Sequence, residues 1–151
     1  MALPDREAMP PNAEPGLRFT IDARICELAP ASERLRHYLD QHRVDAATIF
    51  ALEMVIEEIA TNAMKYGYRP SRDGRITIEA TATERSTELV IEDDADAFDP
   101  TIAPEPDVNR SLESMPVGGL GIHLVRSVRD AFDYERVNGC NRVRVRIDRK
   151  S

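Results

Sequence analysis

The ten prolines of this chain are unevenly distributed, and their positions limit where regular structure can form. Four lie in residues 1–16 and four more in residues 99–117. Proline lacks a backbone donor and restricts the residue before it, so neither stretch can be a long helix or an interior strand. We therefore expect a flexible N-terminal tail at 1–16 and a single domain at 17–151, interrupted by a long loop at about 101–117.

Apolar periodicity is readable on both sides of that loop. The expected elements are a strand at 17–23, helices at 31–42 and 45–66 with Asp45 as N-cap of the second, strands at 76–82 and around 89–91, a helix with Leu120, Leu124, Val128 and Phe132 on one face, and a hairpin turning at Asn138-Gly139. This order predicts an α+β fold. We expect a two-layer α/β sandwich, whose mixed, mostly antiparallel sheet carries its helices on one face.

Composition excludes several classes of function. The 20 Lys and Arg residues against 27 Asp and Glu give a net charge of −7, which argues against direct nucleic-acid binding. No apolar run approaches the roughly 18–20 residues that a bilayer span requires, and the acidic N-terminus does not resemble a secretory signal. The two distant cysteines fit reduced thiols, so we expect a cytoplasmic protein without a membrane segment.

Three short segments could carry chemistry. In the first, Glu58, Asn62 and Lys65 follow one another at spacings of four and three, which places them near one face of a helix. A carboxylate, an amide oxygen and an ammonium in one row suit a hard cation and a phosphate chain. The alternative is a solvated Glu–Lys helix edge, which is common on surface helices.

The second segment is acidic, with four carboxylates in residues 92–98 directly after an apolar strand. Asp93, at the strand end, is well placed to accept a hydrogen bond from an exocyclic amine such as that of adenine. A calcium loop would need a central glycine and a terminal glutamate at fixed spacing, which are absent. The alternative is an acidic turn stabilised by its own backbone hydrogen bonds.

The third segment places Gly118, Gly119 and Gly121 just before the expected amphipathic helix. Glycines let backbone N–H groups approach an anion at a helix N-terminus. The segment is neither a P-loop nor a dinucleotide fingerprint, and a simple hinge is the alternative. No nucleophile elbow or Cys–His pairing appears, so nothing favours a hydrolase.

Together, the three segments resemble the N-box, G1 box and G2 box of the GHKL ATP-binding superfamily, and in particular the bacterial anti-sigma-factor serine-protein kinases. The resemblance rests on Glu58-Ile-Ala-Thr-Asn62-Ala, on Ala97-Phe98-Asp99-Pro100 and on residues 118–126, and covers roughly residues 17–147. It implies the Bergerat fold of that superfamily, with residues 101–117 as a lid over ATP.

The resemblance also implies roles for individual residues. Asn62 would coordinate Mg²⁺ on the ATP phosphates, and Glu58 would orient or deprotonate the attacking serine hydroxyl. Asp93 would bind the adenine amine, and Lys65 would reach a phosphate. The remaining expected nucleotide contacts are Ala95, Gly119, Leu120 and Gly121. Ala95 departs from the family pattern, which has glycine at that position, and alanine there would be costly if the backbone required a positive φ.

The implied function is that of a Mg·ATP-dependent serine/threonine-protein kinase acting as an anti-sigma factor. Its implied partners are a STAS-domain anti-sigma antagonist, which it would phosphorylate, a sigma factor, and a second copy of the chain in a homodimer. The alternative is a non-catalytic, partner-binding module of the same fold, in which nucleotide only switches the conformation for partner exchange or no longer binds at all. Glu58 with Asn62 favours the kinase, whereas Ala95 favours the switch.

Overall fold

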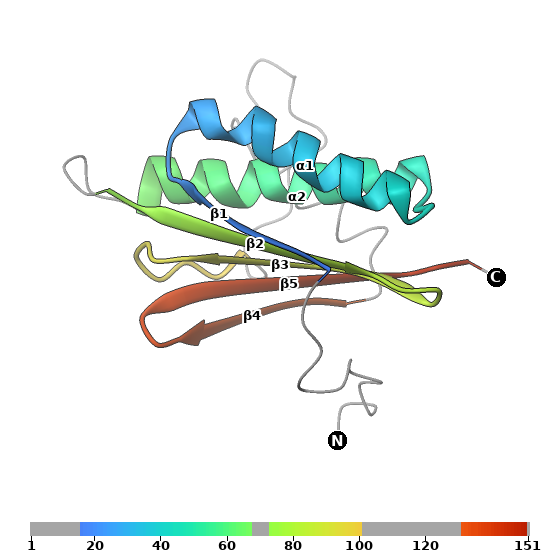
Figure 1. Ribbon diagram of the computed structural model, residues 1–151. Helices are drawn as coiled ribbons and strands as arrows, with labels where there is room; N and C mark the ends of the chain where they lie inside the picture. The colour runs from blue at the N-terminus through green and yellow to red at the C-terminus, as the bar shows by residue number, and fades with distance from the viewer. Residues whose placement is uncertain (1–15, 68–72, 101–130, 151) are drawn as a thin grey trace, which may run out of the picture.

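The computed structural model describes residues 16–67, 73–100 and 131–150 (Figure 1). Its elements are β1 (Leu17–Asp22), η1 (Ile25–Glu27), α1 (Leu28–Gln41), α2 (Ala46–Asn62), η2 (Ala63–Gly67), β2 (Arg75–Ala82), β3 (Ser86–Asp93), β4 (Ala131–Val137) and β5 (Cys140–Asp148). The expected lid at 101–117 lies outside the described residues, as does the expected tail apart from Gly16. Within the described part of the chain, no helix has both the length and the apolarity needed to cross a membrane.

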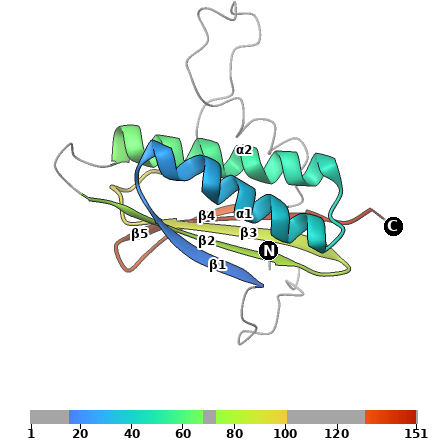
Figure 2. The ribbon, with the colours of Figure 1, turned by 45° about the horizontal axis from the view of Figure 1, so that its top comes forward.

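The strands form one five-stranded sheet in the order β1-β2-β3-β5-β4. Helices α1 and α2 lie side by side on one face of this sheet, as two views show (Figures 1 and 2). The predicted α+β class, with helices on one face, is confirmed. The sheet was expected to be mixed, but every pairing among the described strands is antiparallel.

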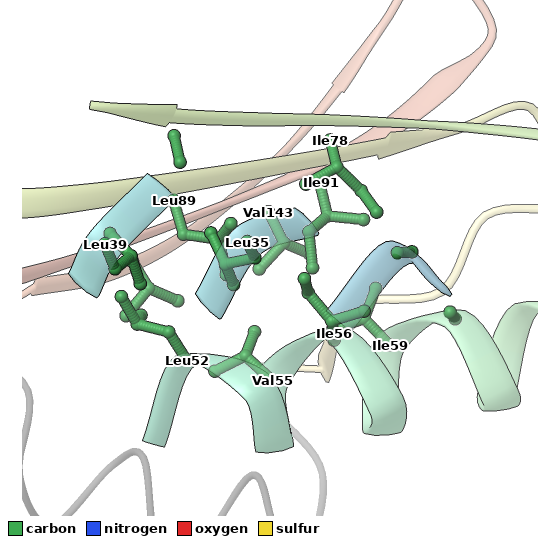
Figure 3. Packing of buried hydrophobic residues seen from close by; sticks show 14 of the residues in the cluster. Leu35, Leu39, Leu52, Val55, Ile56, Ile59, Ile78, Leu89, Ile91 and Val143 are labelled. Atoms are coloured by element: carbon green, nitrogen blue, oxygen red, sulfur yellow. The ribbon is translucent and has the colours of Figure 1, made fainter. Parts of the chain in front are cut away.

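The core lies between the helices and the inward-facing side chains of the sheet (Figure 3). Alternate residues of each strand point inward, because the side-chain period of a strand is two. The labelled residues in this core are Leu35 and Leu39 from α1, Leu52, Val55, Ile56 and Ile59 from α2, and Ile78, Leu89, Ile91 and Val143 from the sheet. This packing anchors the C-terminal end of α2 over the sheet, where the polar segments gather.

Helix α2 begins as the sequence predicts. The side chain of Asp45 accepts from the backbone N–H of Thr48 at 3.0 Å and from its hydroxyl at 2.7 Å. Such an N-cap satisfies a donor that the first helical turn leaves free. The helix ends at Asn62 and continues into the π-helical turn η2, which carries helical structure to Gly67, one residue beyond the expected end.

The start of α1 and the assignment of Phe132 also differ from expectation. Helix α1 begins at Leu28 rather than residue 31, because Pro30 lies in the first turn, where a missing N–H costs nothing. Phe132 was assigned to the face of a helix, which is wrong: it is a buried residue of β4. Its spacing of four from Val128 fits a helix, but Phe132 and Tyr134 also alternate with polar neighbours as in a half-buried strand.

Candidate functional site

A pocket lies where several elements end. It is bordered by the end of α2, the end of β3 with the segment that follows it, and the beginning of β5, all at one end of the molecule (Figures 1 and 2). The pocket encloses about 540 Å³, including space open to solvent. Its lining residues are Ile59, Asn62, Ala63, Asp93, Ala95, Asp96, Ala97, Phe98, Pro100, Asn141 and Val143.

Asp93 provides the buried carboxylate of this pocket. It is the last residue of β3, on the inward row that contains Leu89 and Ile91, and it is only 5% exposed. Its Oδ1 accepts from the backbone N–H of Ala95 at 3.1 Å and from Nδ2 of Asn141 at 2.9 Å. Both donors bond to the same oxygen, Oδ1. The other oxygen, Oδ2, has no hydrogen-bond partner among the described residues.

Burial raises the pKa of Asp93 above its usual value, because desolvation penalises the charged carboxylate. The hydrogen bonds from Asn141 and from the Ala95 backbone act in the opposite direction, since both favour the charged form. Asp93 is therefore a desolvated acceptor whose environment gives a hydrogen bond from a ligand more weight than it would have in water.

Asn141 is the site residue that the sequence analysis missed. It is 4% exposed and lies directly opposite Asp93 in the β3–β5 pairing. The available signal was its position in the strand, because Asn141 precedes Val143, Val145 and Ile147 on the inward-facing row of β5. A polar side chain on an otherwise apolar inward row is a buried polar group that needs partners.

Ala95 adopts an unstrained backbone conformation. Among the described residues other than glycine, positive φ occurs only at Arg43 and Asn138. Ala95 therefore avoids the left-handed region in which a side chain would be costly. It is 2% exposed and lines the pocket beside Asp93, so its methyl group forms part of the pocket wall.

The structure brings three predicted site residues, Asn62, Asp93 and Ala95, to the same pocket. Glu58 lies one turn before Asn62 on α2, and neither Glu58 nor the exposed Lys65 is among the described lining residues. Lys65 was expected to share the face of Asn62 by α-helical spacing, but it belongs to the π-helical turn, where that spacing does not apply. Gly119, Leu120 and Gly121 lie outside the described residues.

The arrangement suits a flat ligand that is apolar on its faces and carries a hydrogen-bond donor at its edge. Ile59 and Val143 provide apolar wall on the sides of α2 and the sheet, and Phe98, although about half exposed, adds an aromatic ring. Asp93 supplies the acceptor, and Asn62 supplies an amide at the end of α2. Among the described residues, no group of three or more His, Cys, Asp or Glu side chains forms a metal-binding cluster.

Comparison with known proteins shows that most of the chain is similar to a known family of ATP-binding domains. Residues 21–147 match the model of the histidine kinase-like ATPase domain. The serine/threonine-protein kinase BtrW of Bordetella bronchiseptica is 32% identical over 107 residues, which cover 71% of this chain and 75% of BtrW. The serine-protein kinase RsbW of Listeria monocytogenes is 32% identical over 84 residues, about half of each chain.

A solved structure agrees with the fold. The crystal structure of the RsbU and RsbW domains of a Mycobacterium tuberculosis protein matches with a TM-score of 0.56 at 14% identity. The match covers 89% of this chain and 34% of that one. With the family model matching residues 21–147, this chain belongs to the family of histidine kinase-like ATPase domains.

Proposed function

We propose that this protein is a Mg·ATP-dependent serine-protein kinase that acts as an anti-sigma factor. The observation that carries the proposal is the buried carboxylate of Asp93, with one oxygen left without a partner among the described residues, on a pocket that Asn62 also lines. The names of the relatives BtrW and RsbW support the kinase activity, since both are serine-protein kinases.

The pocket fits the adenosine part of ATP. Purine bases are flat and largely apolar on their faces, which suits the walls formed by Ile59, Val143 and Ala95. The 6-amino group of adenine would donate to Oδ2 of Asp93. A base with a carbonyl at this position would instead place its oxygen against the carboxylate.

Asn62 fits a role with magnesium. Mg²⁺ is commonly held by one or two protein ligands together with waters and substrate phosphates, so it needs no dedicated cluster of carboxylates. When bound, Mg²⁺ neutralises charge on the phosphates of ATP. The amide oxygen of Asn62, at the end of α2, would be its protein ligand, and Lys65 in the following turn would contact a phosphate.

Glu58 is the proposed catalytic residue. It precedes Asn62 by four residues on α2, so the two side chains extend from adjacent turns of one face. Glu58 would accept the proton of the attacking serine hydroxyl while the serine oxygen bonds to the γ-phosphorus and ADP departs. Phosphoryl transfer depends mainly on positioning and charge stabilisation, which a preformed pocket supplies.

The proposed partners are inferred from the resemblance to anti-sigma-factor serine-protein kinases. We propose a STAS-domain anti-sigma antagonist as the phosphorylated protein, a sigma factor as the regulated partner, a homodimer as the assembly and the cytoplasm as its compartment. The rival function, a nucleotide-dependent switch without catalysis, drew its support from Ala95 in place of glycine. Because Ala95 has no positive φ, strain at that position no longer favours the switch over the kinase.

The deciding experiment is calorimetric titration with ATP in Mg²⁺ and then in EDTA, followed by phosphotransfer to a purified STAS-domain partner. Mg-dependent, saturable ATP binding with transfer of the γ-phosphate to a serine supports the kinase. Binding without transfer supports the switch. The absence of binding up to millimolar ATP would contradict both the kinase and the nucleotide-dependent switch, and would favour a partner-binding module that no longer binds nucleotide.

A further inference from the structure

The amide of Asn141 has partners on both of its ends. Its Oδ1 accepts from the hydroxyl of Tyr134 at 2.6 Å, from Nη1 of Arg136 at 3.0 Å and from the backbone N–H of Phe98 at 3.2 Å. Its Nδ2 donates to Oδ1 of Asp93 at 2.9 Å and to the carbonyl of Asp96 at 2.9 Å. This side chain therefore joins β4, β5, the end of β3 and the segment after it.

These partners determine which way the amide points. Arg136 and the Phe98 N–H can only donate, so the atom that faces them must be the oxygen. The Asp96 carbonyl can only accept, so the atom that faces it must be the nitrogen. A rotated amide would turn its NH₂ toward a guanidinium and its oxygen toward a carbonyl. Asn141 is thus held with a donor directed at Asp93.

We propose that Asn141 is a positioning residue for ligand recognition: its Nδ2 occupies Oδ1 of Asp93 and thereby leaves Oδ2 to read the amino group of a bound nucleobase. The inference rests on the proposed function, because it concerns how the same pocket recognises its nucleotide. With the Ala95 N–H on the same oxygen, the carboxylate is fixed at Oδ1, and only Oδ2 remains for a ligand.

The consequence is a preorganised acceptor. A carboxylate free to rotate would lose conformational freedom on binding, and part of the hydrogen-bond energy would be spent on that ordering. Asn141 also receives the Phe98 N–H, so the same side chain holds the backbone that carries the aromatic wall. Base selectivity should therefore depend on Asn141 even though Asn141 itself need not contact the base.

The sharpest variant is Asn141→Asp. It keeps the shape of the side chain and the oxygen that accepts from Tyr134 and Arg136, but it replaces the donor facing Asp93 with a second carboxylate oxygen. Two carboxylates in contact repel each other and compete for one proton, so Asp93 is no longer held as before. Asn141→Thr is the second variant, because it is too short to restore the amide contact.

The readout is a ratio of two dissociation constants, for ATP and for purine riboside triphosphate, which lacks the 6-amino group. A hydrogen bond to a charged acceptor corresponds to about a 10- to 100-fold preference for ATP in the wild-type protein. We expect that preference to fall to within about threefold in Asn141→Asp and Asn141→Thr. A merely structural role would weaken both nucleotides alike and leave the ratio unchanged.

Tyr134→Phe is the matched control. It removes one donor to the same amide without altering the bond to Asp93, so the preference for ATP should stay above tenfold. Thermal melting of each variant checks that it is folded.

The following results would overturn the positioning role of Asn141 or the proposed function. If the wild-type protein prefers ATP and both folded Asn141 variants keep that preference, the positioning role is wrong while the nucleotide site stands. If only Asn141→Thr folds, its ratio decides; if neither variant folds, Asn141 is a structural residue and the inference is wrong. Equal wild-type binding of both nucleotides would also overturn the inference, and binding of neither would overturn the proposed function with it.

Discussion

Nη1 of Arg136 on β4 donates to the backbone carbonyl oxygen of Ala95 at 2.8 Å, which ties the segment after β3 to the edge strand of the sheet. Nδ2 of Asn141 approaches the same carbonyl at 3.5 Å. The peptide of Ala95 is therefore held by side chains from two strands, with a negative φ that an alanine adopts readily. The family's glycine is not needed to reach this conformation.

Replacing Ala95 with glycine should destabilise the protein. Since Ala95 is not strained, glycine gives the unfolded chain more freedom and also removes a buried methyl group, so we expect Ala95→Gly to lower the free energy of unfolding by at least about 0.5–1 kcal/mol. Urea denaturation measures this change, and ATP titration should show an affinity within a few-fold of wild type. A more stable Ala95→Gly variant would mean that alanine is strained at this position.

Asp93→Asn separates fold from recognition. The amide can keep an oxygen toward the Ala95 N–H and Asn141, so the domain should remain folded. Its NH₂ would then replace the oxygen that we propose for the adenine amine, so ATP should bind at least tenfold more weakly. Calorimetry measures the loss; an unchanged affinity for ATP would show that Asp93 does not contact the base.

The same variant has a signature in pH. Burial raises the pKa of Asp93 above its ordinary value of 3.8, which applies in the unfolded chain. The folded protein therefore binds the proton of the Asp93 carboxyl group more tightly than the unfolded chain does. The contribution of Asp93 to stability is complete below that value and is lost as pH rises through the raised folded pKa. The free energy of unfolding of Asp93→Asn, minus that of wild type, should therefore increase from pH 4 to pH 7 in urea denaturation.

The roles of Asn62 and Glu58 separate under mutation. We expect Asn62→Ala to abolish Mg-dependent ATP binding, whereas Glu58→Ala retains binding and loses phosphotransfer. Glu57→Ala is the matched control, since Glu57 is the exposed neighbour of Glu58 on α2. Transfer of ³²P from labelled ATP to a STAS-domain partner is the assay, and a wild-type rate in Glu58→Ala would refute its catalytic role.

The cap of α2 has a measurable effect on stability. Asp45→Ala should cost about 1 kcal/mol, because it leaves the Thr48 N–H without its acceptor. The hydrogen bond from the Thr48 side chain holds the pKa of Asp45 below its usual value, so this stabilisation is present above the unfolded pKa and is lost as pH falls through the folded one. Asp45→Asn keeps the cap but does not titrate. The free energy of unfolding of the wild type, minus that of Asp45→Asn, should therefore decrease as pH falls through the folded pKa of Asp45.

Much of the fold could be predicted because its signals are local. Alternation in β1 and β2, the spacing of apolar residues in α2 and the cap at Asp45 each depend on neighbours within a few residues. Phe132 was misassigned because it lies where two periods overlap. The change to a π-helical turn at Ala63 has no comparable sequence signal, since it adds one residue to a turn without changing its composition.

The site was less predictable because it depends on residues far apart in the chain. Asp93 stood out because it follows an apolar strand, and Asn62 because of its spacing from Glu58. Asn141 lies close to the Asn138-Gly139 turn, where a polar residue is unremarkable, and its partner Asp93 is 48 residues away. Only the pairing of β3 with β5 shows that the two side chains meet.

That pairing has a consequence for how the family can diversify. Strand β3 lies beside β5 in the sheet, although residues 94–139, which include β4, separate the two strands along the chain. Because the β3–β5 pairing sets the register of Asp93 and Asn141, family members can vary in sequence outside these two strands while the two side chains stay in contact.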